Sequence, residues 1–162
     1  MSSRRQTPDA QPVNVKIHFF RFLLCFSRSR DLHGLGGNMF RILLAGTDSR
    51  LLATRAAVLS KTGGAVVYGN PMETLATLDS NETFELVVLC HTLEESDVAA
   101  IVDKVHQSIC GAKILMVTSE LDGYRANVNS KIDATTKAEP GHLVALAKEM
   151  LEVASLASHA GV

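Results

Sequence analysis

The sequence predicts an α/β protein built around a doubly wound, five-stranded parallel sheet with the strand order 2-1-3-4-5. Two observations carry this prediction. From Met39 onward, short apolar runs alternate with segments of helical period, which is typical of βαβ units with right-handed crossovers. Five such units fit into about 115 residues, the size of one small doubly wound domain.

The first unit runs from Arg41 to Gly64. "RILLAG" (41–46) is a continuous apolar run closed by glycine, as expected for a strand that is buried on both faces. The next segment predicts a helix with Asp48 or Ser49 as its N-cap and Gly63-Gly64 as its stop. The apolar face of this helix consists of Leu52, Ala56 and Leu59.

The second and third units repeat the pattern. "AVVYG" (65–69) predicts a strand, and the following helix begins with a capping box formed by Asn70 as N-cap, Pro71 as first residue and Glu73 as third. "FELVVL" (84–89) predicts the third strand, followed by a helix from Ser96. We expect the apolar faces to hold Met72, Leu75 and Leu78 in the first helix, and Val98, Ile101, Val102 and Val105 in the second.

The signal is weaker after the fourth strand, "AKILMV" (112–117). Residues 118–137 contain few large apolar side chains, and we expect a short helix near 120–126 and a fifth strand near 131–135. A long helix then starts near Pro140. The apolar face of this last helix consists of Leu143, Leu146, Ala147, Met150, Leu151 and Ala154.

This arrangement is flavodoxin-like, and in such folds ligands bind at the carboxyl ends of the strands, near the point where the strand order reverses. The residues predicted at that edge are Gly46, Thr47, Asp48, Cys90, His91, Thr118, Ser119 and the segment around Lys137.

Composition and charge are those of a single globular domain with a basic extension. The chain has 162 residues, of which 46% are hydrophobic and 20% charged. Residues 1–38 contain six Lys/Arg and two acidic residues, whereas the remainder contains ten basic and fifteen acidic residues. The acidic remainder lacks the basic face that phosphate-backbone binding requires, so we expect no nucleic-acid partner.

We expect residues 1–38 to be a disordered or weakly structured extension, residues 39–156 to form the domain, and residues 157–162 to be a short flexible tail. The apolar stretch "VKIHFFRFLLCF" (15–26) is interrupted by Lys16, His18 and Arg21 and is shorter than the roughly 20 residues of a membrane span. It also lacks the features of a signal peptide. We therefore expect a cytoplasmic protein without a membrane partner. A further hypothesis is that the native chain starts at Met39 and that residues 1–38 come from an upstream start codon.

The three cysteines, Cys25, Cys90 and Cys110, are odd in number and match no zinc-binding spacing. They are expected to be reduced thiols, with no metal or cofactor. Cys90 and His91 are adjacent at the end of a strand, where neighbouring side chains point to opposite sides. This geometry does not suit a cysteine-histidine nucleophile pair.

Four blocks of the chain resemble a known family. They are "ILLAGTDSRLLATRAAVL", "FELVVLCHTLEESD", "AKILMVTSE" and "IDATTKAEPGHLVALAKEML". In order and spacing they resemble the receiver domains of bacterial two-component response regulators, over essentially all of residues 39–152. The resemblance implies an acidic metal-binding pair after strand one, a phosphoacceptor aspartate after strand three, a Thr or Ser after strand four and a lysine after strand five.

This chain departs from the receiver pattern at the acidic positions. The acidic pair falls on Gly46 and Thr47, with Asp48 just beyond, and the phosphoacceptor falls on Cys90. Thr118 fits the hydroxyl position, and the lysine falls on Thr136 or Lys137. Magnesium requires oxygen ligands, usually carboxylates, and phosphoryl transfer depends on that metal. The resemblance therefore implies a degenerate receiver, or pseudo-receiver, without aspartyl phosphorylation.

The function predicted from the sequence is a stand-alone receiver-like module of phosphorelay signal transduction, without enzymatic activity. It is expected to act through a protein partner, either a sensor kinase or an output protein, with a homodimer left open. Cys90 is expected to fill the vacated acceptor position as a small apolar residue. One alternative is a thiol-based redox sensor or cysteine enzyme that uses Cys90. Another is a small-ligand binding domain of flavodoxin-like type, although the missing Gly-rich phosphate loop counts against it.

Overall fold

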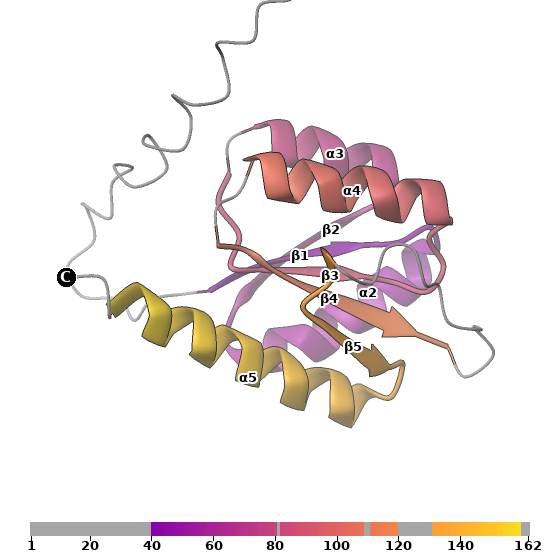
Figure 1. Ribbon diagram of the computed structural model, residues 1–162. Coiled ribbons are helices and arrows are strands. Elements are labelled where there is room, and N and C mark those ends of the chain that lie inside the picture. The colour runs from indigo at the N-terminus through magenta and orange to yellow at the C-terminus, as the bar shows by residue number, and fades with distance from the viewer. Residues whose placement is uncertain (1–39, 81, 109–110, 120–130, 160–162) are drawn as a thin grey trace, which may run out of the picture. The chain divides into compact units, whose positions relative to one another are not determined.

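The computed structural model describes residues 40–80, 82–108, 111–119 and 131–159. Within these residues, five parallel strands form one sheet in the order β2-β1-β3-β4-β5 (Figure 1). The strands are β1 (Arg41–Ala45), β2 (Ala65–Gly69), β3 (Leu86–Leu89), β4 (Lys113–Thr118) and β5 (Ala134–Lys137). The predicted fold class and strand order are confirmed.

Helices cover both faces of the sheet. They are α2 (Ser49–Leu59) with a 3-10 turn η2 (Ser60–Thr62), α3 (Pro71–Asp79), α4 (Glu95–Ser108) and α5 (Pro140–His159). α3 and α4 lie on one face, and α2 and α5 lie on the other (Figure 1). Among the described helices, none combines the length and apolar character needed to cross a membrane.

The helix starts confirm the predicted caps. Asp48 is the N-cap of α2, and its Oδ1 accepts hydrogen bonds from the backbone N–H groups of Arg50 and Leu51. Asn70 and Glu73 form a reciprocal capping box at the start of α3. Each cap satisfies backbone donors that would otherwise lack a partner in the first turn.

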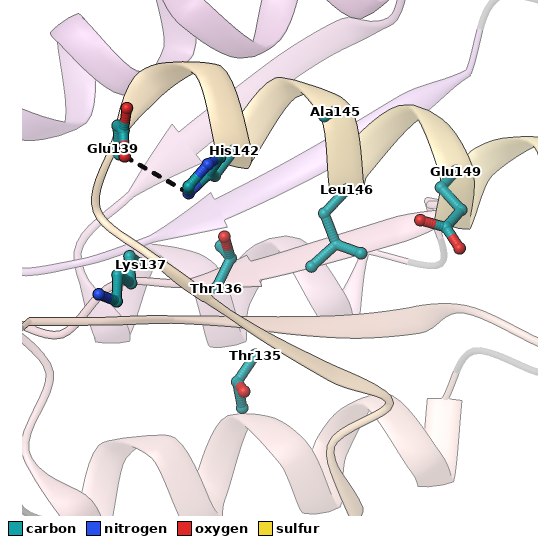
Figure 2. Close-up of a pocket in the computed structure, with 8 residues that line it drawn as sticks. All are labelled: Thr135, Thr136, Lys137, Glu139, His142, Ala145, Leu146 and Glu149. Atoms are coloured by element: carbon teal, nitrogen blue, oxygen red, sulfur yellow. Dashed lines mark ion pairs between the residues drawn. The ribbon is translucent and has the colours of Figure 1, made fainter.

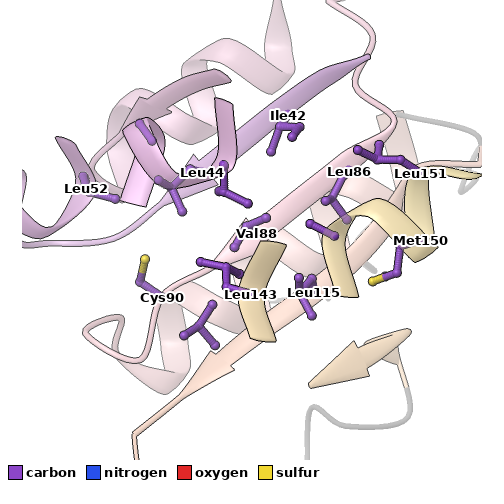
Figure 3. Packing of buried hydrophobic residues seen from close by; sticks show 14 residues of the cluster. Ile42, Leu44, Leu52, Leu86, Val88, Cys90, Leu115, Leu143, Met150 and Leu151 are labelled. Carbon is purple, nitrogen blue, oxygen red and sulfur yellow. The ribbon is translucent and has the colours of Figure 1, made fainter. Parts of the chain in front are cut away.

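Two apolar layers sandwich the sheet. Along β3, Val87 and Leu89 face the layer under α3 and α4, whereas Leu86, Val88 and Cys90 face the layer under α2 and α5. Figure 3 shows the second layer, with side chains from β1, β3 and β4 packed against α2 and α5. Each fully buried Leu or Ile contributes about 1.5–3 kcal/mol to stability.

Several sequence-based details are corrected by the structure. Met72 is 78% exposed, and Thr74 is buried in its place beside Leu78. The reason is geometric, because residues two positions apart on a helix lie about 200° apart around its axis. β3 begins at Leu86 rather than at residue 84.

The C-terminal part also differs from expectation. β5 begins at Ala134, three residues later than expected, because the Asp133 carboxylate accepts a hydrogen bond from the Ile114 backbone N–H just before the strand pairing starts. α5 continues to His159, beyond the expected domain end at 156. The expected helix near 120–126 and the expected extension at 1–38 lie outside the described residues.

Candidate functional site at the carboxyl edge of the sheet

The ends of β1 and β3 bring Gly46 and Cys90 together. The Cys90 backbone N–H donates to Ala45 O at 2.9 Å, which extends the strand pairing by one step. A Cβ atom at Gly46 would lie 3.0 Å from Leu52 Cδ2, 3.1 Å from Cys90 Cβ and 3.2 Å from Thr92 Oγ1. The space beside Gly46 is therefore already filled, and a larger side chain does not fit without movement of its neighbours.

The loops that follow β1 and β3 are joined by side-chain hydrogen bonds. The Thr47 backbone N–H donates to Thr92 Oγ1 at 3.2 Å, and the Thr47 hydroxyl donates to Thr92 O at 3.0 Å. Leu93 is 1% exposed and packs in the layer under α3 and α4, and its N–H donates to Cys90 O. These contacts hold the two loops together, while the Thr47 side chain stays at the exposed surface.

Asp48 lies next to Gly46 and Thr47 in sequence, but its carboxylate serves α2. Oδ1 lies 2.9 Å from Arg50 N and 3.1 Å from Leu51 N. Across the described ranges, no group of three or more His, Cys, Asp or Glu side chains has a geometry suited to a metal ion. The cap is thus the role of Asp48 that the hydrogen bonds support.

Cys90 is a free cysteine with a fully buried side chain. It belongs to the same apolar layer as Leu52 of α2 and Leu143 of α5 (Figure 3). Burial raises the pKa of the Cys90 thiol, and the charge and hydrogen bond of the neighbouring Arg55 side chain oppose that rise. The thiolate, which is the nucleophilic form, is accordingly disfavoured at neutral pH.

Arg55 is the functional residue that sequence reasoning missed. Its side chain is only 5% exposed, and its Nη2 lies 3.0 Å from His91 Nδ1. A guanidinium group only donates, so Nδ1 must accept, and the neutral imidazole carries its proton on Nε2. The signal in the sequence was a cation on the buried stripe of a helix, three residues after Leu52 and four before Leu59.

Thr118 and Lys137 end β4 and β5 and are paired in register. The Thr118 hydroxyl donates to Thr136 O at 3.2 Å. The sequence left Thr136 and Lys137 as alternatives for the position of the receiver lysine, and in the structure Lys137 is the last residue of β5.

An open pocket of about 540 Å³ lies along β5 and the first turns of α5 (Figure 2). Glu139 and His142 form an ion pair there, with Oε2 and Nδ1 3.4 Å apart. The remaining lining residues are Thr135, Thr136, Lys137, Ala145, Leu146 and Glu149. Gly46 and Cys90 do not line this pocket, so the filled space beside Gly46 is a separate feature.

Comparison with known proteins rests on structure. No protein-family model matches the chain, and no curated protein matches it. The signal receiver domain of a LuxO repressor protein from Vibrio parahaemolyticus shares the fold with a TM-score of 0.65 and 13% identity, over 76% of this chain and 98% of that one. A CheY-like receiver domain from Methanospirillum hungatei gives a TM-score of 0.59 and 24% identity, over 73% and 98% of the two chains.

The fold is that of a receiver domain. A third similar structure is a pilus assembly-related protein from Burkholderia pseudomallei, with a TM-score of 0.57 and 20% identity over 75% of this chain and 96% of that one. The same fold thus occurs in a signal receiver domain and in a pilus assembly-related protein. Because one fold serves different functions, the function of this chain has to be argued from its own site.

Proposed function

We propose that residues 39–156 are a degenerate receiver, a signalling module of the two-component type that is not phosphorylated on aspartate. In this proposal the chain is cytoplasmic, has no enzymatic activity and acts by binding a protein, either a sensor kinase or an output protein. A homodimer is the alternative assembly. The observation that carries the proposal is the tight packing beside Gly46 and the full burial of the Cys90 thiol, at two positions where the receiver resemblance implies carboxylates.

The chemistry of the donors argues against magnesium binding. Gly46 has no side chain, the Thr47 hydroxyl donates to Thr92 O, and the Cys90 sulfur is both buried and a soft ligand. Magnesium binds hard oxygen donors in near-octahedral geometry and usually retains several water molecules. Phosphoryl transfer depends on such a metal to neutralise the developing charge.

The open pocket along β5 and α5 supports a role in protein binding. Its lining combines the apolar side chains of Ala145 and Leu146 with the charged groups of Lys137, Glu139 and Glu149. The receiver resemblance implies that the fifth strand and fifth helix belong to the output or dimerisation face. We therefore assign the contact with a protein partner to this pocket.

The direct test is incubation of the full chain with acetyl phosphate and Mg²⁺, followed by mass spectrometry under conditions that preserve acyl phosphates. The expected result is no phosphorylated aspartate. An active receiver domain treated in parallel is the positive control for the reagent. A labile phosphoryl group on Asp48, or on any other aspartate, would contradict the proposal.

A further inference from the structure

Arg55 is a buried charge without a matching anion. Its side chain is 5% exposed, and among the residues that the structure describes no carboxylate forms an ion pair with it. Its Nη1 atom is buried and has no hydrogen-bond acceptor within the same described ranges. Burial of an unpaired charge costs free energy, so a negative group placed beside Arg55 would stabilise the folded chain.

Cys90 is the neighbour that can become negative. The described side chains that interact with the Arg55 guanidinium are His91, which accepts from Nη2, and Cys90, whose thiol pKa the neighbouring Arg55 lowers, against the larger rise caused by burial. The imidazole is neutral in this hydrogen bond. Asp48 is bound at the start of α2. A negative charge formed at the Cys90 sulfur would therefore lie next to the Arg55 guanidinium.

We propose that Cys90 is an oxidation site whose sulfinate product is paired with the buried guanidinium of Arg55. The oxidant is hydrogen peroxide, the simplest hydroperoxide. In the first step Sγ attacks one peroxide oxygen, the O–O bond breaks, and the products are the sulfenic acid and water. In the second step the sulfenic acid reacts with another hydroperoxide to give the sulfinate, a proton that goes to solvent, and water. Sulfur loses two electrons in each step, and each hydroperoxide gains two.

The sulfinate of Cys90 matches the guanidinium of Arg55 in shape and charge. A sulfinate has two oxygens that share one negative charge, as a carboxylate has, and a guanidinium binds such groups through parallel N–H donors. The unpartnered Nη1 would then gain an acceptor. Oxidation would also create an aspartate-like charge at position 90, where the receiver resemblance implies an aspartate. This inference goes beyond the proposed interaction module and does not depend on the identity of a partner.

Burial of the Cys90 thiol slows its oxidation. The side chain is fully buried, and the thiolate is the reactive form. Oxidation therefore requires opening of the turn after β3. It is expected to be slow at neutral pH and faster as the pH rises.

The test uses the full chain with Cys25→Ser and Cys110→Ser, so that Cys90 is the sole thiol. This chain and the same chain with Arg55→Met are treated with hydrogen peroxide while folded. Peptide mass spectrometry measures the gain of two oxygens on Cys90, and Tm is measured before and after. We expect the sulfinate to leave Tm unchanged or higher when Arg55 is present, and to lower Tm when Arg55 is replaced.

Two outcomes would overturn the proposal. One is a folded chain that stays reduced at peroxide concentrations that oxidise Cys90 fully in urea. The other is an equal fall in Tm with and without Arg55. A genetic mimic covers the case in which Arg55→Met does not fold: with Arg55 intact, Cys90→Asp should have a higher Tm than Cys90→Asn, and the reverse order would contradict the pairing. The aspartyl phosphate assay is a separate readout of the proposed function.

Discussion

The two ends of the sheet's carboxyl edge differ in access and in polarity. Around β1 and β3, Gly46 is packed against Leu52, Cys90 and Thr92, and the buried Arg55 side chain contacts His91. Along β5 and α5, an open pocket exposes charged side chains of both signs. The comparison shows that one edge of this sheet holds two different environments, a tightly packed one around Gly46 and an open, charged one along β5 and α5.

The largest expected effect comes from restoring an acid beside β1. Gly46→Asp places a Cβ within 3.0 to 3.2 Å of three neighbours, and overpacking of this kind costs about 1–3 kcal/mol before the burial of the carboxylate is added. Urea denaturation should show this loss. Gly141→Asp is the matched control, because no atom lies within 4 Å of a Cβ at Gly141. Equal losses for the two variants would mean that the space beside Gly46 is not closed.

The second effect is a change in stability when the buried Arg55 is replaced. Arg55→Met removes an unpaired charge and keeps an apolar side chain of similar length, so the free energy of unfolding should stay equal or rise by about 1–3 kcal/mol. Unfolding by denaturant measures this free energy. Arg50→Met, at an exposed position of the same helix, should change stability by less than about 0.5 kcal/mol. A large loss of stability for Arg55→Met would show that the charge is already compensated.

The third effect is a pH dependence from Cys90. Burial raises the pKa of this thiol, so the folded protein keeps the proton at pH values where the unfolded chain loses it. Its contribution is complete below the ordinary thiol pKa and is lost as the pH rises past about 9.0, by about 1.4 kcal/mol per pH unit until the folded thiol ionises. Urea denaturation from pH 7 to 10 should show a steeper fall in stability than the same series on Cys90→Ala. Parallel curves would contradict the assignment.

The smallest effect on stability is expected in the open pocket. Glu149 is exposed and lines the pocket, so Glu149→Lys should change the free energy of unfolding by less than about 0.5 kcal/mol while weakening binding to a partner at this face. Affinity capture followed by quantitative mass spectrometry compares the variant with Glu152→Lys, an exposed position outside the pocket lining. Equal recovery of partners by the two variants would place the binding surface elsewhere.

Local rules in the sequence predicted much of the fold. Asp48 and the Asn70–Glu73 capping box were predictable because each helix start depends on hydrogen bonds within four residues. The exposure of Met72 was not, because spacing shows which residues share a helix face but not how that face is rotated toward the sheet. The start of β5 depended on the Asp133 contact with Ile114, which joins segments 19 residues apart.

The residue types that depart from the receiver pattern were predictable from the sequence, whereas the contact of Arg55 with His91 was not. Glycine and cysteine at positions 46 and 90 are visible in the sequence once the strands are aligned. The approach of Arg55 to His91 joins residues 36 positions apart and depends on how α2 packs against the end of β3. A charged residue on an apolar helix stripe is a sequence signal for such a contact, but its partner appears only in the folded chain.

The most direct test of the central claim is a Mg²⁺ titration of the full chain followed by amide NMR spectroscopy. The absence of side-chain carboxylates at Gly46, Thr47 and Cys90 predicts no saturable chemical-shift change at Thr47, Cys90 or Thr118 as Mg²⁺ rises to millimolar concentration. An active receiver domain provides the positive control. Saturable changes that centre on these three amides would contradict the account, because they would show a magnesium site where no group of three or more described His, Cys, Asp or Glu side chains is placed to hold one.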